Sequence, residues 1–592
     1  MAAIAPDPMI DYRVEPGDLH GHQFRVTLTV ARPAADQQVS LPVWINGSYM
    51  VRDFARHLSG LAARQGGRPV TVQALDKSRW QVACSGRGAL TLRYRVYAFD
   101  ASVRAAFLDA ARGFFNGSSL CLRVHGQEGA PHRLRLGRLP AQWQVATAMP
   151  ADDSRPHCWR AADYAELLDH PFELGRFWRG QFEAGGVPHE LVVSGAWPGF
   201  DGARLLADAQ RICAVQIAFW HGPGQRPPFE RYVFLLHAVG DGYGGLEHRA
   251  STALIAARRD LPQLALQGRA EASSDGHVTL LGLISHEYFH SWNVKRLLPA
   301  DLQTIEHQAE NPTRLLWFFE GFTSYYDDLL LLRSGLIDAP RYLRLLAKTL
   351  NAVTATPGRQ VQSVAEASFD AWTKYYRPDE HTPNSTVSYY QKGALVALAL
   401  DLTLRQQGRS LDAVMQGLWQ RCVMGSDGSV TEADIGAVVA AVAQKPLPDW
   451  LADWVHGTDD LPLPELLAAF GIEQRPERGG LAATLGLRLS EGVVSGVQVK
   501  TVLAGGPAHL AGVAAGDELL AIDGWRIRRL DEAQGWLARD APFELLLVRD
   551  QRVMSLRVDP LAGQAPGEVL SLHLLARPAA AVARRRRAWL GA

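Results

Sequence analysis

The chain has 592 residues, of which 47% are hydrophobic and 21% are charged. A chain of this length is too long for one hydrophobic core, so several domains are expected. Lys plus Arg and Asp plus Glu both number 61, and the resulting formal net charge of zero gives no electrostatic reason to expect a nucleic-acid or membrane-surface partner.

The cysteines and the N-terminus narrow the class of protein further. The five cysteines are scattered and form no C-x-x-C pair, so neither a disulfide framework nor a cysteine zinc site is predicted. The first residues lack the basic region and apolar run of a signal peptide, and no apolar stretch of about 18 residues predicts a membrane span. We expect a soluble, cytoplasmic protein, or a periplasmic one if a leader is missing from the sequence.

Residues 1–180 are predicted to form a β-rich N-terminal domain. Polar and apolar residues alternate at residues 22–30, 41–45 and 90–98, and Gly, Pro and Asp separate these segments. This period of two is typical of antiparallel strands. Residues 101–112 interrupt the strands with a helix-like pattern.

Residues 181–470 are predicted to form a mixed, mostly helical domain. The sequence RYVFLLHAV at residues 231–239 indicates a strand, and longer helical patterns surround it. These helical patterns cover residues 202–220, 278–297, 313–333, 340–351, 388–405 and 410–422. Another short helix is expected within residues 462–478, before a Gly-Gly linker at residues 479–480.

Residues 480–562 return to strand-like alternation with many glycines. The sequence LGLRL at residues 485–489 resembles the carboxylate-binding loop of a PDZ domain, and later Gly-rich turns match the bacterial protease-type PDZ pattern. Such a groove binds an extended peptide by strand addition; a purely packed accessory domain is the alternative.

Residues 563–592 are predicted to form a basic C-terminal tail. Four consecutive arginines occupy residues 584–587. We expect a solvated, flexible end, and binding to an anionic surface is the alternative.

His286, Glu287 and His290 form an H-E-x-x-H pattern inside an apolar-periodic run that predicts a helix. Residues four apart share one helix face, so both imidazoles can reach one zinc ion at Zn–N distances of about 2.0–2.1 Å. Glu287 falls beside the ion, where it can take a proton from the activated water. With 19 His in 592 residues, about 0.03 chance matches are expected; the alternative is a surface helix with two histidines.

Glu320 is the best candidate for the third ligand that a catalytic zinc site requires. It lies in the sequence WFFEGFTSYY, and a carboxylate among aromatic residues is costly unless it is paired or bound to metal. The alternative is a capped or salt-bridged core acid. Asp327 or Asp328 could accept a hydrogen bond from a ligand histidine, although a solvated helix face explains them equally well.

HEYFHSWNVKR followed by LLWFFEGFTSYY resembles the M61 family of metallopeptidases, the glycyl aminopeptidase family. The motifs are more distantly similar to the M1 aminopeptidases, which share the gluzincin arrangement of two histidines and a glutamate. The 29 residues between His290 and Glu320 exceed the M1 spacer and favour M61. The resemblance implies a multidomain α+β fold: a β-rich N-terminal domain, a thermolysin-like and mostly helical catalytic domain at residues 181–470, and a C-terminal PDZ domain.

Two further matches to M1 motifs imply substrate contacts. GGLEH at residues 244–248 follows a predicted strand, where M1 enzymes have G-x-M-E-N. The resemblance implies that Glu247 binds the free α-amino group of the substrate and that Gly245 contacts the substrate; a solvated loop glutamate is the alternative. Tyr390, in YQKGA, resembles the M1 tyrosine that donates a hydrogen bond to the oxyanion, with a buried core tyrosine as the alternative.

Residues 240–245 also match G-x-G-x-x-G directly after a strand, with Asp260 at a suitable distance for a ribose. A dinucleotide site requires a βαβ unit with an apolar second strand. The sequence RRDLP after Ala257 does not begin such a strand. We therefore do not expect a nucleotide site.

We expect a metallopeptidase that holds one Zn²⁺ ion and removes the first residue of peptides with a free N-terminus. The family resemblance implies a preference for small first residues such as Gly or Ala. The alternatives are a zinc endopeptidase, which would cleave blocked peptides as readily, and a non-catalytic PDZ-bearing peptide-binding protein, which the presence of Glu287 disfavours. A peptide C-terminus in the PDZ groove is the second expected partner.

Overall fold

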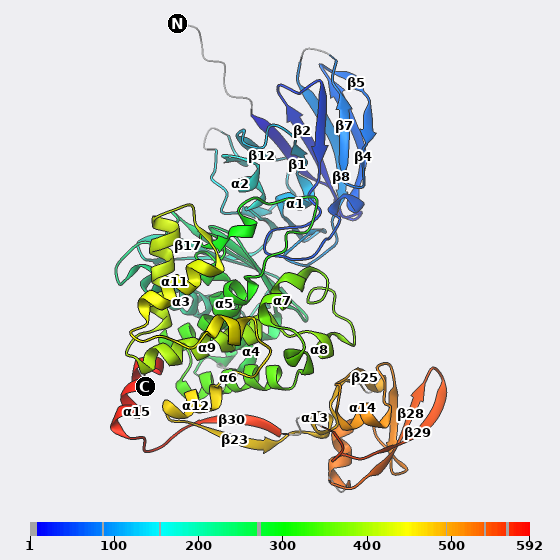
Figure 1. The fold of residues 1–592 in the computed structure, drawn as a ribbon. Helices are drawn as coiled ribbons and strands as arrows, with labels where there is room; N and C mark the ends of the chain where they lie inside the picture. Colours follow the sequence, from blue (N-terminus) through cyan, green and yellow to red (C-terminus); the bar gives the residue numbers. More distant parts are fainter. Residues whose placement is uncertain are drawn as a thin grey trace. The chain divides into compact units, whose positions relative to one another are not determined.

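The structure is a computed structural model that describes residues 9–85, 88–152, 155–268, 274–492, 494–537, 540–563 and 568–591. The chain divides into two compact units, Met1–Asn311 and Pro312–Ala592. Sheets dominate the first unit, whereas the second unit passes from helices to a C-terminal β region (Figure 1). The expected multidomain α+β fold class is confirmed. Across the described ranges, no helix is long and apolar enough to cross a bilayer.

The largest N-terminal sheet has the strand order β14-β12-β1-β2-β8-β4-β5. Buried and exposed residues alternate along its central strands, as the period of two in the sequence predicts. Its strands are β1 (Ile10–Asp18), β2 (Gln23–Val30), β4 (Leu58–Gln65), β5 (Arg68–Val70), β8 (Leu90–Tyr97), β12 (His132–Leu136) and β14 (Cys158–Ala161).

Two smaller sheets complete the N-terminal region, with orders β13-β15-β10-β9 and β11-β3-β7-β6. Their strands are β3 (Asp36–Ser40), β6 (Val72–Ala74), β7 (Arg79–Ala83), β9 (Ala106–Leu108), β10 (Arg112–Phe115), β11 (Arg123–Val124), β13 (Gln144–Ala146) and β15 (Phe172–Gly175). The short helices α1 (Gly117–Leu120) and α2 (Tyr164–Leu168) lie in the same region of the chain.

The helix expected at residues 101–112 is wrong, because this segment forms a hairpin of β9 and β10. The carboxylate of Asp109 accepts hydrogen bonds from the backbone N–H groups of Ala111 and Arg112 and so fixes the turn. Residues 41–45 are not a strand either. Their backbone donates single hydrogen bonds to the carbonyls of Ser78 and His307 and makes no ladder.

The second half of the first unit contains the sheet β16-β17-β18-β20-β19. Strand β18 pairs in parallel with β17 and β20, and β19 pairs antiparallel with β20 at the sheet edge. The elements are β16 (Trp178–Ala184), β17 (Val187–Ser194), α3 (Gly202–His221), β18 (Tyr232–Val239), β19 (Tyr243–Glu247), β20 (Ser251–Ala257), α4 (Asp275–Phe289) and β21 (Leu298–Pro299). Helices α3 and α4 are joined by the side chain of Gln216, which donates hydrogen bonds to the carbonyl and the hydroxyl of Ser285.

The second unit begins with helices that pack around α5 and α9. Gly321 and Gly393 lie where these two helices cross, and a Cβ atom on either residue would overlap the backbone of the other helix. The helical part contains α5 (Leu316–Arg333), α6 (Ala339–Thr354), α7 (Val364–Phe369), α8 (Thr382–Ser385), α9 (Tyr389–Gln406), α10 (Leu411–Leu418), β22 (Ser429–Val430), α11 (Glu432–Val442) and α12 (Leu463–Ala469).

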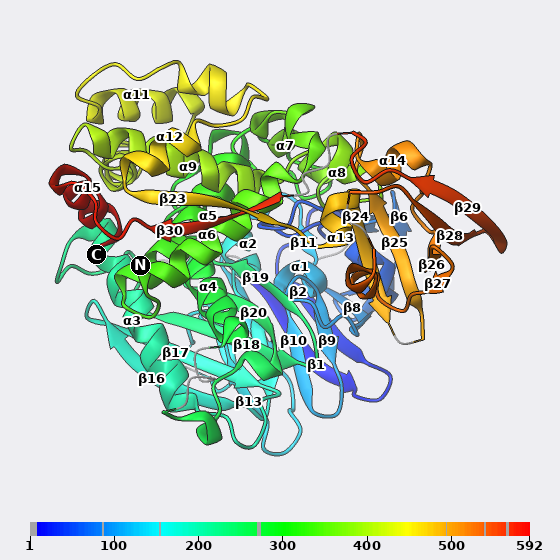
Figure 2. The ribbon, with the colours of Figure 1, turned by 90° about the horizontal axis from the view of Figure 1, so that it is seen from below.

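Strand β23 (Ile472–Arg478) precedes the C-terminal β domain in the chain, and strand β30 (Glu568–Leu574) follows it. The two strands pair antiparallel as a two-stranded ribbon (Figure 1). Figure 2 shows β30 beside α6, where the amide of Asn351 hydrogen-bonds both backbone groups of Leu570. The β domain has the order β24-β25-β26-β28-β29 with its own apolar core. Its elements are α13 (Leu481–Leu485), β24 (Leu487–Gly492), β25 (Gly496–Val502), α14 (Pro507–Ala511), β26 (Glu518–Ile522), β27 (Trp525–Arg526), β28 (Phe543–Arg549) and β29 (Arg552–Val558).

The prediction of a flexible basic tail is wrong, because residues 584–587 lie in a docked helix, α15 (Ala580–Leu590). Trp589 is 1% exposed, packs against Tyr342 and Phe470, and donates a 3.1 Å hydrogen bond to the Tyr325 hydroxyl. Arg584 remains exposed. The apolar C-terminal end of α15 therefore anchors the whole helix, although its basic side chains had suggested a solvated tail.

Replacing Trp589 with Ala should lower the free energy of unfolding by about 3 kcal/mol, because it removes a fully buried aromatic side chain. The exposed control Arg584→Ala on the same helix should change it by less than about 0.5 kcal/mol. Urea denaturation of both variants measures the two values. Equal effects of the two substitutions would mean that α15 is not anchored through Trp589.

Candidate metal centre and substrate site

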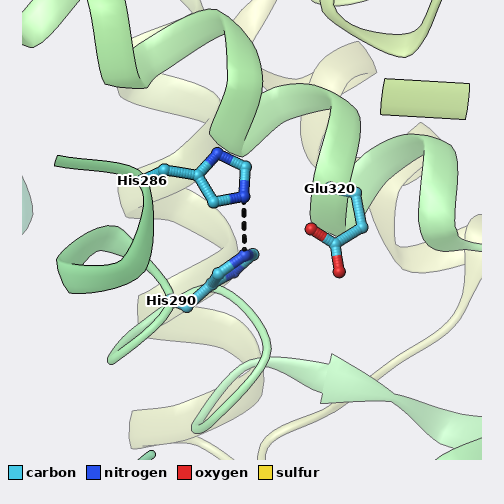
Figure 3. Close-up of side chains that lie close together, drawn as sticks. All are labelled: His286, His290 and Glu320. Atoms are coloured by element: carbon cyan, nitrogen blue, oxygen red, sulfur yellow. Dashed lines mark hydrogen bonds between the residues drawn. The ribbon is translucent and has the colours of Figure 1, made fainter. Parts of the chain in front are cut away.

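The H-E-x-x-H pattern lies at the end of α4, which begins and ends earlier than the sequence predicts. His290 caps the helix, and its Nδ1 lies 2.8 Å from the carbonyl oxygen of Asn293. A carbonyl only accepts, so Nδ1 carries the proton and the Nε2 lone pair is available for a metal. That Nε2 atom lies 3.0 Å from Nε2 of His286 (Figure 3).

His286, His290 and Glu320 form a group that could hold a metal ion, since one ligand atom from each lies within 4.8 Å of the others. Figure 3 shows the two imidazoles and the carboxylate side by side. Ligands of a tetrahedral zinc at about 2.0–2.2 Å lie roughly 3.5 Å apart, so small side-chain rotations close the site. Two imidazoles and a carboxylate, with Glu320 only 3% exposed, fit zinc as the donor set of a catalytic centre.

Glu287 is buried in α4 and lies against the edge strand β19. A Cβ atom at Gly245 would overlap the carboxylate of Glu287. The glycine therefore lets the edge strand approach the carboxylate predicted as general base.

Glu247 projects from the same face of β19 as the missing Cβ of Gly245, because side chains alternate along a strand. Residues two apart are separated by about 6.6 Å. The Glu247 carboxylate is 6% exposed, and Lys295 lies 3.7 Å from it. The backbone of Gly47, at φ 89°, covers it so closely that a Cβ atom there would overlap the carboxylate.

Tyr390 occupies the first turn of α9, next to the crossing with α5 that Gly321 and Gly393 permit. Its hydroxyl lies 3.0 Å from the hydroxyl of Tyr376. Burial and the nearby Glu320 carboxylate raise the pKa of Tyr390 well above its usual 10. The tyrosine therefore stays protonated at neutral pH and can donate a hydrogen bond.

Three further residues around these groups were missed by the sequence analysis. Tyr376 lies against Tyr390, Lys295 lies beside Glu247, and Asp169 lies on the other side of Lys295. Lys295 follows His290 by five residues, within the segment HEYFHSWNVKR that carries the family resemblance, so its position was a usable signal. Asp169 and Tyr376 lie far from any motif and gave none.

The competing G-x-G-x-x-G interpretation is excluded by the path of the chain. Residues 240–245 run into β19, an antiparallel edge strand, and not into a helix. A dinucleotide site needs a helix whose N-terminus receives the pyrophosphate.

The C-terminal β domain has the elements of a peptide groove. Gly486, at φ 71°, ends α13 and leads directly into β24, which lies at the edge of its sheet. An edge strand after such a loop can accept an added peptide strand.

Comparison with protein families matches three models in chain order. Residues 11–176 match the peptidase M61 N-terminal domain, residues 279–396 the M61 glycyl aminopeptidase, and residues 498–549 a PDZ domain. No curated protein sequence matches the chain.

Among solved structures, an aminopeptidase N family protein from Idiomarina loihiensis is 38% identical, with a TM-score of 0.90 over 98% of this chain and 100% of that one. An M1 zinc metallopeptidase from Deinococcus radiodurans, bound to a Tyr-Ser-Ala substrate, is 16% identical, with a TM-score of 0.46 over 78% of this chain and 96% of that one. A yeast LTA4 hydrolase is 11% identical, with a TM-score of 0.45 over 78% of this chain and 70% of that one.

Proposed function

Since this chain belongs to the M61 glycyl aminopeptidase family, we propose that it is a zinc-dependent aminopeptidase that hydrolyses the first peptide bond of peptides with a free N-terminus. His286, His290 and Glu320 would hold one zinc ion. The observation that supports the aminopeptidase assignment most strongly is the position of Glu247. It lies two residues along β19 from Gly245, the residue against which Glu287 lies.

The chemistry is shared between the ion and the side chains around it. Zinc, when bound, supplies a Lewis acid that polarises the scissile carbonyl and lowers the pKa of the attacking water. Glu287 takes the proton from that water and returns it to the leaving amine. Tyr390, kept protonated by its raised pKa, donates a hydrogen bond to the negative charge that develops on the carbonyl oxygen.

The charge around Glu247 supports its role as the anchor of the substrate N-terminus. Glu247 and Asp169 contribute two negative charges and Lys295 one positive charge. Burial lowers the pKa of His248, which is therefore neutral at pH 7. Glu247, Asp169 and Lys295 together keep one negative charge, which the α-ammonium group of a substrate complements.

The preference for Gly and Ala belongs to the same proposal. It is supported by the family to which the chain belongs and by the backbone of Gly47, which lies against the Glu247 carboxylate. A first residue with a large side chain has to fit beside this backbone. Peptide C-termini are the proposed ligands of the edge strand β24 in the PDZ domain.

The Glu247→Gln variant tests the proposal, because it removes the charge and keeps the size of the side chain. We expect kcat/KM on Ala-p-nitroanilide to fall by about 100-fold, as for the loss of one partner of a buried charge pair. Residual hydrolysis of N-acetyl-Ala-p-nitroanilide should not change, because this substrate carries no ammonium group. Unchanged kinetics on the unblocked substrate would reject Glu247 as the anchor and favour an endopeptidase.

A further inference from the structure

Lys295 lies between two carboxylates. Its Nζ is 3.6 Å from Oδ1 of Asp169 and 3.7 Å from Oε1 of Glu247. Full charge-assisted hydrogen bonds of this kind measure about 2.7–2.9 Å. The ammonium therefore stands midway and makes a close contact with neither acid.

The backbone before Lys295 is strained. Val294 has a φ of 119°, which a β-branched residue rarely adopts. Its N–H donates to the carbonyl of Leu297, and the N–H of Lys295 donates to the carbonyl of His290. This turn places Lys295 directly after the last residues of the metal-binding motif and beside Glu247.

Asp169 is fixed from the opposite side. Its Oδ2 accepts a 2.8 Å hydrogen bond from the backbone N–H of Arg249, and its Oδ1 lies 3.3 Å from Nδ1 of His248. Burial by itself raises the pKa of Asp169. Lys295 and His248 lower it by more than burial raises it, so the pKa of Asp169 lies below its usual range. Asp169 therefore carries its charge at neutral pH.

The two carboxylates beside Lys295, those of Asp169 and Glu247, differ in their access to water. Asp169, His248 and Lys295 line a cavity of about 340 Å³. The Asp169 side chain is 17% exposed and the Glu247 side chain 6%. A desolvated carboxylate attracts a nearby ammonium more strongly than a hydrated one, so Lys295 would pair with Glu247 if nothing held it back.

We propose that Asp169 is a positioning residue that holds the ammonium of Lys295 away from Glu247, so that the Glu247 carboxylate remains available to the α-ammonium group of the substrate. This inference rests on the proposed role of Glu247. Asp169 then sets how much the enzyme's own lysine competes with the substrate for one carboxylate.

The Asp169→Asn variant should raise KM for Ala-p-nitroanilide about tenfold and leave kcat within about twofold, because it weakens ground-state and transition-state binding equally. Asparagine keeps an oxygen that can accept from Arg249. The double variant Asp169→Asn/Lys295→Met should return KM to within about threefold of wild type, since the competing ammonium is gone. Lys295→Met alone should give a KM at or below that of wild type.

Asp11→Asn is the matched control, because Asp11 is also a largely buried acid, paired with Arg133 and Arg135 in the N-terminal sheet. It should not change KM. A double variant that is worse than Asp169→Asn, or a raised KM in Lys295→Met, would overturn the proposal and make the cluster a support of the fold. Glu247→Gln in the same series separates the anchor role of Glu247 from the positioning role of Asp169. If Glu247→Gln keeps the wild-type KM, both roles are rejected. If Glu247→Gln raises KM and Asp169→Asn does not, only the role of Asp169 is rejected.

Discussion

Glu287→Gln should lower kcat/KM on Ala-p-nitroanilide by about 10³- to 10⁴-fold, the range that a positioned general base contributes. Glutamine fills the same space beside Gly245 but cannot take a proton. The metal ligands are not touched, so zinc content should equal that of wild type. Steady-state kinetics combined with metal analysis measures both quantities on one preparation.

Glu310→Gln provides the control, since Glu310 is an exposed glutamate and should keep wild-type activity. A Glu287→Gln enzyme that retains more than about a tenth of its activity with zinc in place would show that another group accepts the proton. A variant that has lost its zinc would instead assign Glu287 to the fold of the metal site.

Glu320→Ala should weaken zinc binding by more than about 100-fold, because loss of an outer partner of a metal ligand already costs 10- to 100-fold. Zinc binds the native state, so adding it should raise the unfolding temperature of the wild type. In Glu320→Ala this stabilisation should largely disappear. Titration against a chromogenic chelator and thermal unfolding with and without zinc measure the two effects without any assay of activity.

The exposed Glu477 in β23 offers a matched Glu→Ala control, which should bind zinc as the wild type does. If Glu320→Ala keeps the wild-type affinity for zinc, Glu320 is a buried core acid and the third ligand has to be sought elsewhere.

The metal centre was predictable because its signals are local. His286 and His290 are fixed by their spacing on one helix, and Glu320 stands out as a carboxylate in an aromatic run. The family and the fold class followed from the same motifs and are confirmed. The roles of Glu287, Glu247 and Tyr390 remain predictions, as does a hydrogen bond from a ligand histidine to Asp327 or Asp328.

The features that could not be predicted from the sequence depend on contacts between distant parts of the chain. Residues 101–112 have helical composition, but the turn at Asp109 and the pairing with β10 override that propensity. The docking of α15 depends on Tyr325 and Tyr342, more than 200 residues earlier. Asp169 reaches the substrate region only through the fold, so the sequence around it carries no signal.

Mass-spectrometric analysis of a pentapeptide that begins with Ala, supplied with a free or an acetylated N-terminus, tests directly whether the protein is a zinc aminopeptidase. A zinc aminopeptidase removes Ala from the free peptide first, leaves the acetylated peptide intact, and stops when a chelator is added. Internal fragments from both peptides at similar rates would reject the aminopeptidase assignment and make the protein an endopeptidase.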